Sequence, residues 1–167
     1  MFGGHAISGV TNDLWSYHYK NDSWVAIKTI NQPSVRYWYT MNYDSVNDLM
    51  VVFGGRESEY VGDNYLKNET WTFNPRTNIW NQISSKNCPS SRTSAYTVFD
   101  PNENKTILFG GMTSFSPLTA NNEIWIFQNG QWSNVIPKTD SGIISGFTII
   151  IVLSVITIIT QKKRDFP

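Results

Sequence analysis

The stretch Asp48-Leu49-Met50-Val51-Val52-Phe53-Gly54-Gly55 decides the fold, because similar stretches recur along the chain. Lys105-Thr106-Ile107-Leu108-Phe109-Gly110-Gly111 matches it when the two are aligned on their glycines, and Phe2-Gly3-Gly4 matches its end. A short apolar run such as Leu49–Phe53 suits a strand that is covered on both faces. The glycine pair lets the backbone take a positive φ and approach another segment closely. The chain therefore contains repeats of one strand-rich unit.

Two tryptophans and one arginine keep regular places relative to these glycines. Turn-forming residues such as Asn74–Asn78 separate the two tryptophans of a pair, and Asn129-Gly130 is a strong signal for a two-residue hairpin. Each pair is therefore expected on two short antiparallel strands. The recurring residues are Gly3, Gly4, Trp15, Trp24, Arg36, Gly54, Gly55, Trp71, Trp80, Arg92, Gly110, Gly111, Trp125 and Trp132.

This order of features resembles the kelch repeat: an arginine, an apolar strand that ends in Gly-Gly, and two further strands with aromatic residues. The resemblance implies that each unit is one blade of four antiparallel strands, a to d, in a β-propeller. The expected fold class is all-β, a partial kelch-type propeller of about two and a half blades with one C-terminal transmembrane helix. The expected divisions are 1–27 (half blade with strands c and d), 28–83 and 84–137 (blades), 138–141 (linker), 142–161 (transmembrane helix) and 162–167 (basic cytoplasmic tail).

Arg36 and Arg92 have two interpretations. One is contact with a ligand. The other is structural, because a guanidinium has five N–H donors to place and a blade core offers carbonyl groups. The resemblance implies the structural role, with each guanidinium bonded to backbone carbonyls between blades.

Residues 142–161 carry no charge and consist mostly of Ile, Val, Leu and Phe. Roughly 20 helical residues span a hydrocarbon core of about 30 Å, and the apolar side chains here favour insertion by roughly 5 kcal/mol at most. Lys162, Lys163 and Arg164 follow directly, so the C-terminus is expected in the cytoplasm and the N-terminal part outside or in a lumen. Because Met1–Gly4 is not a signal peptide, the alternative is a tail-anchored protein whose N-terminal part is cytosolic.

Composition excludes several classes of function. The chain has 13 basic and 13 acidic residues, and this balance gives no case for nucleic-acid binding. Neither the two histidines, His5 and His18, nor the single cysteine, Cys88, has partners at metal-ligand spacing. No phosphate loop or hydrolase motif is present. We therefore expect no catalytic residues, no cofactor, no metal and no enzymatic activity.

The favoured function is a membrane-tethered interaction module that binds a partner protein or glycan. Two alternatives stay open: a truncated, non-functional remnant of a longer kelch protein, and, less favoured, an oxidase built on a propeller. The latter would need a Tyr–Cys pair and histidine ligands, which Cys88, His5 and His18 do not suggest.

Partner contacts are expected on one rim of the propeller. The connections between strands b and c are long (5–11, 56–67 and 112–121), and they share this rim with the d–a connections at 28–34 and 84–91. The opposite rim carries the shorter a–b and c–d turns. Long loops on a rigid scaffold concentrate binding residues, and Tyr and Arg are enriched at energetically important interface positions. The candidate contact residues are Arg56, Glu57, Glu59, Tyr60, Tyr65 and Phe115.

Overall fold

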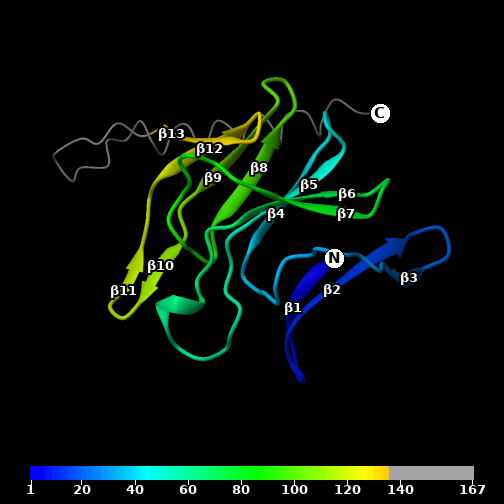
Figure 1. The fold of residues 1–167 in the computed structure, drawn as a ribbon, viewed down its shortest axis with the longest axis horizontal. Helices are drawn as coiled ribbons and strands as arrows, with labels where there is room; N and C mark the ends of the chain where they lie inside the picture. Colours follow the sequence, from blue (N-terminus) through cyan, green and yellow to red (C-terminus); the bar gives the residue numbers. More distant parts are fainter. Residues whose placement is uncertain (136–167) are drawn as a thin grey trace, which may run out of the picture. The chain divides into compact units, whose positions relative to one another are not determined.

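A computed structural model describes residues 1–135 of the chain. These residues form three antiparallel β-sheets of three or four strands, in sequence order, and one smaller two-stranded sheet (Figure 1). The all-β expectation is thereby confirmed. Within the part of the chain that the structure describes, no helix is long and apolar enough to span a membrane. The predicted transmembrane helix at 142–161, with its linker and basic tail, lies outside the described residues.

The N-terminal sheet has three strands, in the order β1-β2-β3. The sequence predicts only strands c and d here, but the residues at the end of strand b also pair, because Phe2 lies opposite Leu14 and Ala6 opposite Gly9. This extra pairing makes the first b–c connection a hairpin. The strands are β1 (Phe2–Ala6), β2 (Gly9–His18) and β3 (Ser23–Ala26).

The middle and C-terminal sheets each have four strands, in the orders β4-β5-β6-β7 and β8-β9-β12-β13. Their inner strands come from the apolar runs that precede Gly-Gly. Asn129 and Gly130 both have positive φ (51° and 74°), which confirms the two-residue hairpin. The strands are β4 (Thr40–Asp44), β5 (Leu49–Phe53), β6 (Thr70–Asn74), β7 (Ile79–Ile83), β8 (Tyr96–Asp100), β9 (Lys105–Phe109), β12 (Ile124–Gln128) and β13 (Gln131–Asn134).

The remaining elements belong to the b–c connections. In the middle sheet this connection contains a single 3-10 turn, η1 (Asp63–Tyr65). In the C-terminal sheet it forms a hairpin of β10 (Met112–Phe115) and β11 (Leu118–Ala120). The long connections are thus ordered pieces of structure in their own right. In Figure 1 all three project at the lower side of the described domain.

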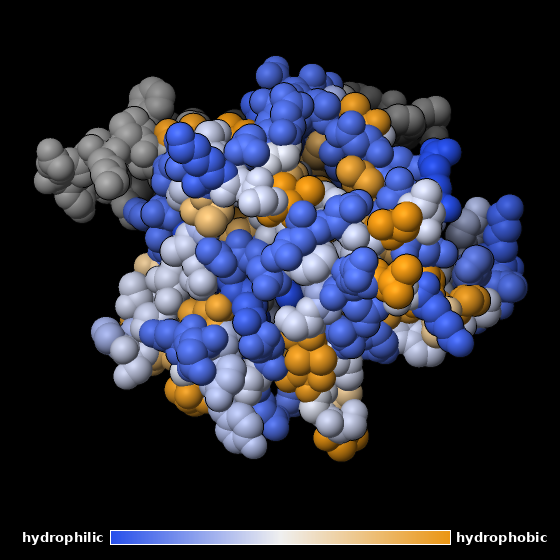
Figure 2. All heavy atoms as spheres, in the orientation of Figure 1, coloured by the Kyte–Doolittle hydropathy of each residue, from blue (hydrophilic) through white to orange (hydrophobic). Residues whose placement is uncertain are grey.

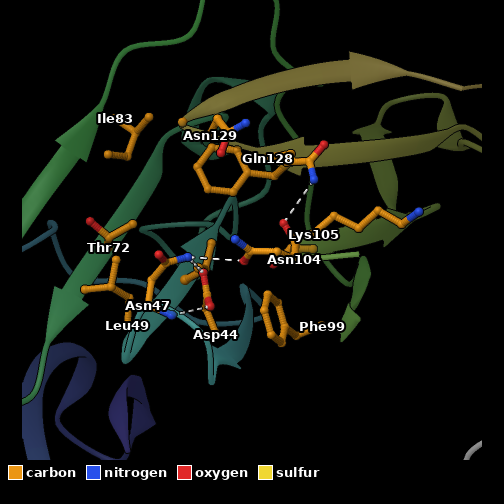
Figure 3. Close-up of a pocket in the computed structure, with 14 residues that line it drawn as sticks. Asp44, Asn47, Leu49, Thr72, Ile83, Phe99, Asn104, Lys105, Gln128 and Asn129 are labelled. Carbon is orange, nitrogen blue, oxygen red and sulfur yellow. Dashed lines mark hydrogen bonds between the residues drawn. The ribbon is translucent and has the colours of Figure 1, made fainter. Parts of the chain in front are cut away.

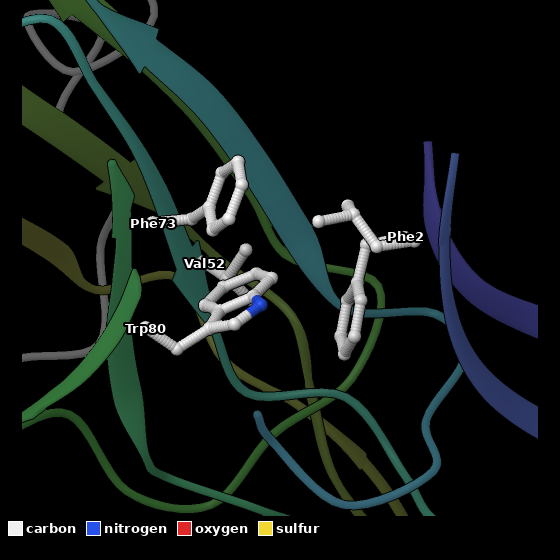
Figure 4. Close-up of a cluster of buried hydrophobic side chains, with 5 residues drawn as sticks. Phe2, Val52, Phe73 and Trp80 are labelled. Carbon is white, nitrogen blue, oxygen red and sulfur yellow. The ribbon is translucent and has the colours of Figure 1, made fainter. Parts of the chain in front are cut away.

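Two hydrophobic clusters join the sheets pairwise. The first lies between the N-terminal and middle sheets, where Phe2 packs on Trp80 with ring centroids 4.8 Å apart (Figure 4). The second lies between the middle and C-terminal sheets, where Phe53 packs on Trp132 at 5.2 Å. Successive residues of β5 serve different clusters, because Val52 joins the first and Val51 the second. The middle sheet is therefore covered on both faces.

The first two Gly-Gly pairs, Gly3-Gly4 and Gly54-Gly55, lie against the arginine of the following sheet. Gly55 N–H donates to the carbonyl of Arg92 at 2.9 Å, and Gly4 N–H donates to the carbonyl of Arg36 at 3.0 Å. A Cβ atom on Gly54 would lie 2.6 Å from the Arg92 carbonyl oxygen, and φ at Gly54 is +69°. The glycines are needed here for both close approach and backbone conformation.

The buried arginines bond within their own sheets. The Arg36 side chain is fully buried and donates to the carbonyl oxygens of Ser34 (3.1 Å) and Gly54 (3.3 Å) and to Glu69 Oε2 (2.7 Å). Arg92 repeats this pattern with Ser90, Gly110 and Glu123. The side-chain bonds thus hold one sheet together, and it is the arginine backbone that reaches the preceding sheet.

Candidate interaction surface

The three b–c connections, called the b–c loops below, are bonded to one another. His5 Nε2 of the first loop lies 3.1 Å from Glu59 Oε2 of the second. Asp63 of the second loop accepts hydrogen bonds from Phe115 N–H and Ser114 Oγ of the third, each at 2.7 Å. These bonds, the Phe115 N–H bond foremost, hold the pKa of the Asp63 carboxyl below its ordinary value. The loops therefore form one linked surface, although they come from three sheets.

Arg56 lies beneath this surface and holds two of the loops. Its side chain is 4 % exposed, and its Nε donates to the Ser58 carbonyl at 2.7 Å, while a terminal nitrogen bonds the Tyr60 carbonyl. The guanidinium carbon lies 4.5 Å from the centre of the Phe115 ring and also close to the ring of Tyr37. Arg56 thus fixes the second loop and supports the third.

The candidate contact residues differ in accessibility. Tyr60 is 71 % exposed, and the Glu59 side chain is 60 % exposed. Glu57 and Tyr65 are half-buried, and Glu57 is bonded to Lys67 Nζ at 2.9 Å. Phe115, expected to be exposed, is half-buried against Arg56. Of the set, Tyr60 and Glu59 offer the most surface, whereas Arg56 and Phe115 position the loops.

Three exposed apolar residues of the b–c loops were not among the sequence candidates. Ile7 stands in the first loop, fully exposed, Val61 in the second at 78 % and Leu118 in the third at 71 %. Their signal was weak, since a single aliphatic residue in a polar loop is common. Figure 2 shows a mostly hydrophilic face with separate hydrophobic patches, several of them at the lower margin where the b–c loops lie.

The opposite rim has a groove of about 240 Å³ between the turns of the middle and C-terminal sheets (Figure 3). Asn47 Nδ2 bonds Asp44 Oδ2 at 2.8 Å and Asn104 Oδ1 at 3.2 Å, and Gln128 Nε2 donates to the Glu103 carbonyl at 2.7 Å. The Asn47–Asn104 bond therefore joins the turns of the two sheets, while the other two bonds lie within one sheet.

The residues considered for metal or redox chemistry lie apart. Among residues 1–135, no group of three or more His, Cys, Asp or Glu side chains is placed to hold a metal ion. Cys88 is exposed, with Asn68 Nδ2 at 3.5 Å from its sulfur.

Comparison with known proteins agrees with this architecture. The KLHDC2/KLHL20/DRC7 Kelch-repeats domain model matches residues 1–151. The chain belongs to the kelch-repeat family. Residues 142–151 of the predicted membrane segment fall inside the matched range. No curated protein matches the chain significantly.

Among solved structures, the one titled "Structure of YjhT" is similar, with a TM-score of 0.65 and 18 % identity. The match covers 84 % of this chain and 49 % of that one, so this kelch chain spans about half the length of the matched structure. At this identity the likeness shows the fold alone. Kelch-repeat domains are in general protein-interaction modules.

Proposed function

We propose that this kelch chain is a membrane-tethered interaction module that binds a partner protein or glycan through the rim of its b–c and d–a loops. The observation that carries the proposal is the linkage of the three b–c loops by His5–Glu59, Asp63–Phe115 and the Arg56–Phe115 contact. Independent loops would have to be ordered upon binding, whereas linked loops lose less conformational entropy. This linkage favours a binding surface over tolerated insertions.

The exposed residues of the surface suit a partner that offers both apolar and polar contacts. Tyr60, Val61 and Leu118 supply apolar area, and Glu59 supplies a carboxylate whose bonded neighbour, His5, is itself partly exposed. Tyrosine contributes large area at a small cost in side-chain entropy. We expect Tyr60 to contribute most to binding.

Site-specific photocrosslinking of the full chain in its own cells tests the choice of rim. A photoreactive phenylalanine analogue replaces Tyr60 on the b–c rim or, as the matched control, Val46 in an a–b turn of the same sheet. Val46 is 53 % exposed. Adducts with one recurring protein at position 60 but not at position 46 support the proposal, and a glycan array probed with the same chain tests the glycan arm.

Substitution then separates contact from positioning. Tyr60→Ala is expected to weaken partner binding by roughly 30-fold or more, as at a typical hot spot. Arg56→Ala is expected to weaken it through loss of loop order, with increased hydrogen exchange in residues 57–66. If changes at the turns around Asp44 and Arg76 abolish binding and Tyr60→Ala does not, the opposite rim is the binding site.

The two alternative functions, a non-functional remnant and a propeller oxidase, are judged by different observations. The middle and C-terminal sheets keep complete repeat motifs and well-packed clusters, which does not favour a non-functional remnant. A propeller oxidase would carry a bound metal, so metal analysis of the purified chain tests that alternative. The absence of enzymatic activity stays a prediction.

The tether belongs to the proposal as well. Residues 142–161 would cross the bilayer once, with the C-terminus in the cytoplasm and the kelch part extracellular or lumenal. In the alternative orientation the chain is tail-anchored and its kelch part is cytosolic, so the same rim would face the cytosol.

A further inference from the structure

Each sheet presents one aromatic pair formed by strands c and d. The pairs are Tyr17–Trp24, Phe73–Trp80 and Phe127–Trp132; in each, the two residues are directly opposed in the strand register, and the ring centroids lie 5.0 Å apart. The equal geometry shows that the three pairs are equivalent features of the repeat.

Two of these pairs are covered by a phenylalanine from the preceding sheet. Phe2 packs on Trp80 at 4.8 Å, and Phe53 packs on Trp132 at 5.2 Å. Both phenylalanines are 1 % exposed, and both come from a Phe-Gly-Gly motif. A sheet junction therefore consists of a Phe plug and an aromatic-pair receptor.

One plug and one receptor have no counterpart among residues 1–135. Phe109, the third Phe of a Phe-Gly-Gly motif, is 37 % exposed. Tyr17 and Trp24, which form the first receptor, are 47 % and 53 % exposed, whereas the members of the other two pairs are all 8 % exposed or less. The described domain thus carries both halves of a junction on opposite ends of its row of sheets.

We propose that two copies of this chain associate head to tail, with Phe109 of one copy packed on the Tyr17–Trp24 pair of the other. The inference goes beyond the rim proposed above and uses different residues. Two junctions inside the chain already show that these surfaces are complementary in shape and chemistry. Because plug and receptor are different surfaces, the contact is heterologous, and each dimer keeps one free plug and one free receptor.

The contact is expected to be weaker than the junctions within the chain. The N-terminal sheet has three strands and no counterpart of β4. When it packs on the C-terminal sheet of the other copy, it therefore leaves strand β8 of that sheet uncovered. Tyr96 on β8, which is 79 % exposed, would stay exposed in the dimer. Association should therefore depend on concentration and extend beyond dimers only when the protein is concentrated.

Complementary variants of the full chain in mild detergent test the proposal. Trp24→Lys disables the receptor and keeps the plug, whereas Phe109→Lys disables the plug and keeps the receptor. In sedimentation and light scattering, each variant alone is expected to be monomeric, with association weakened roughly 30-fold or more. Their mixture is expected to form a one-to-one dimer that does not grow, because only one competent plug and one competent receptor remain.

Tyr19→Lys is the matched control, because Tyr19 is an exposed aromatic residue (78 %) of the same sheet in the c–d turn, away from the receptor pair. It should associate as the wild type does. Tryptophan fluorescence reports whether each variant keeps its internal junctions, and Tyr17→Lys replaces Trp24→Lys if the latter does not. A wild-type chain that is monomeric would overturn the proposal, and so would a mixture that stays monomeric. Single variants that still associate as the wild type does would also overturn it. That last outcome would place association elsewhere, for example at Gly142 and Gly146, whose spacing of four residues can let two membrane helices approach closely.

Discussion

Trp132 donates its indole N–H to Thr70 Oγ1 at 2.8 Å across the junction of the middle and C-terminal sheets. At the junction of the N-terminal and middle sheets, Trp80 is the equivalent of Trp132. Leu14 is the equivalent of Thr70, because Leu14 lies opposite Phe2 as Thr70 lies opposite Phe53. The Trp80 N–H is buried and has no partner among the described residues. Two junctions with the same aromatic packing thus differ by one hydrogen bond.

Thr70→Val is therefore expected to lower the free energy of unfolding by about 1–3 kcal/mol, because the buried Trp132 N–H would lose its acceptor while the packing volume stays nearly constant. Urea unfolding of the full chain followed by tryptophan fluorescence measures the change. Thr77→Val, at an exposed position of the turn between β6 and β7, serves as the control and should be nearly neutral. At the other junction, Leu14→Thr should be at least as stable as Leu14→Val, since the hydroxyl would give Trp80 an acceptor. A less stable Thr variant would contradict this account.

Stability is expected to fall in acid through Glu69 and Glu123. Burial works to raise the pKa of each carboxyl, but hydrogen bonds from Arg36 and Trp71, or from Arg92 and Trp125, outweigh burial and hold the pKa below its ordinary value. A lowered folded-state pKa means that the unfolded chain binds more protons, so stability is fully present above about pH 4.3 and is lost as the pH falls further. The free energy of unfolding between pH 7 and pH 3 measures this.

The variant with both Glu69→Gln and Glu123→Gln tests the assignment of the acid sensitivity. It should be less stable at pH 7 and show a shallower loss of stability below about pH 4.3. Some slope should persist, because the pKa values of Asp48 and Asp63 are also lowered by hydrogen bonds. An unchanged slope would mean that the buried arginines do not govern the acid response.

Gly54→Ala is expected to destabilise the chain more than Gly130→Ala does. Both glycines have similar positive φ values (69° and 74°), so the cost of backbone strain is shared. Only at Gly54 would the new methyl group meet a neighbour, the Arg92 carbonyl, whereas nothing lies within 4 Å at Gly130. Overpacking of this kind adds about 1–3 kcal/mol. Equal losses in urea unfolding would show that close approach at the junction is unimportant.

The apolar segment at 142–161 is expected to resist carbonate extraction from membranes, and an antibody should reach the C-terminal tail only after permeabilisation. Leu153→Arg with Ile156→Arg should release the chain, because two central arginines oppose insertion by roughly 6 kcal/mol. A wild-type chain that carbonate removes would contradict the span. A tail that antibody reaches in intact cells would contradict the orientation.

The sheets were largely predictable because each unit carries its own turn and glycine motifs. Asn129-Gly130 permits hardly any structure but a tight hairpin, and the Phe-Gly-Gly motifs fix the register of the repeats. The acidic partners of the arginines were missed, although Glu69 and Glu123 hold the same place in their units. Their role depends on contact between residues distant in sequence, which a repeat alignment does not reveal without a reason to look for it.

The b–c loops were harder to predict. Arg56 looked like a contact residue because arginine is common at interfaces, yet the chain turns back over it and Phe115 of the next repeat covers it. Loop conformation depends on such contacts between repeats, which leave no periodic pattern. The three exposed aliphatic tips were missed for the same reason.

The contact between a Gly-Gly pair and the arginine of the next repeat, seen at Gly4 and Gly55, has a consequence for synthesis on the ribosome. Gly55 N–H finds its acceptor, the Arg92 carbonyl, only in the following repeat, and the Trp132 ring that covers Phe53 comes later still. A newly made sheet therefore emerges with one face exposed, and that face stays exposed until the next repeat has been synthesised. Pauses in translation within a repeat would prolong this exposure, whereas pauses after the second tryptophan of a pair would let each junction close.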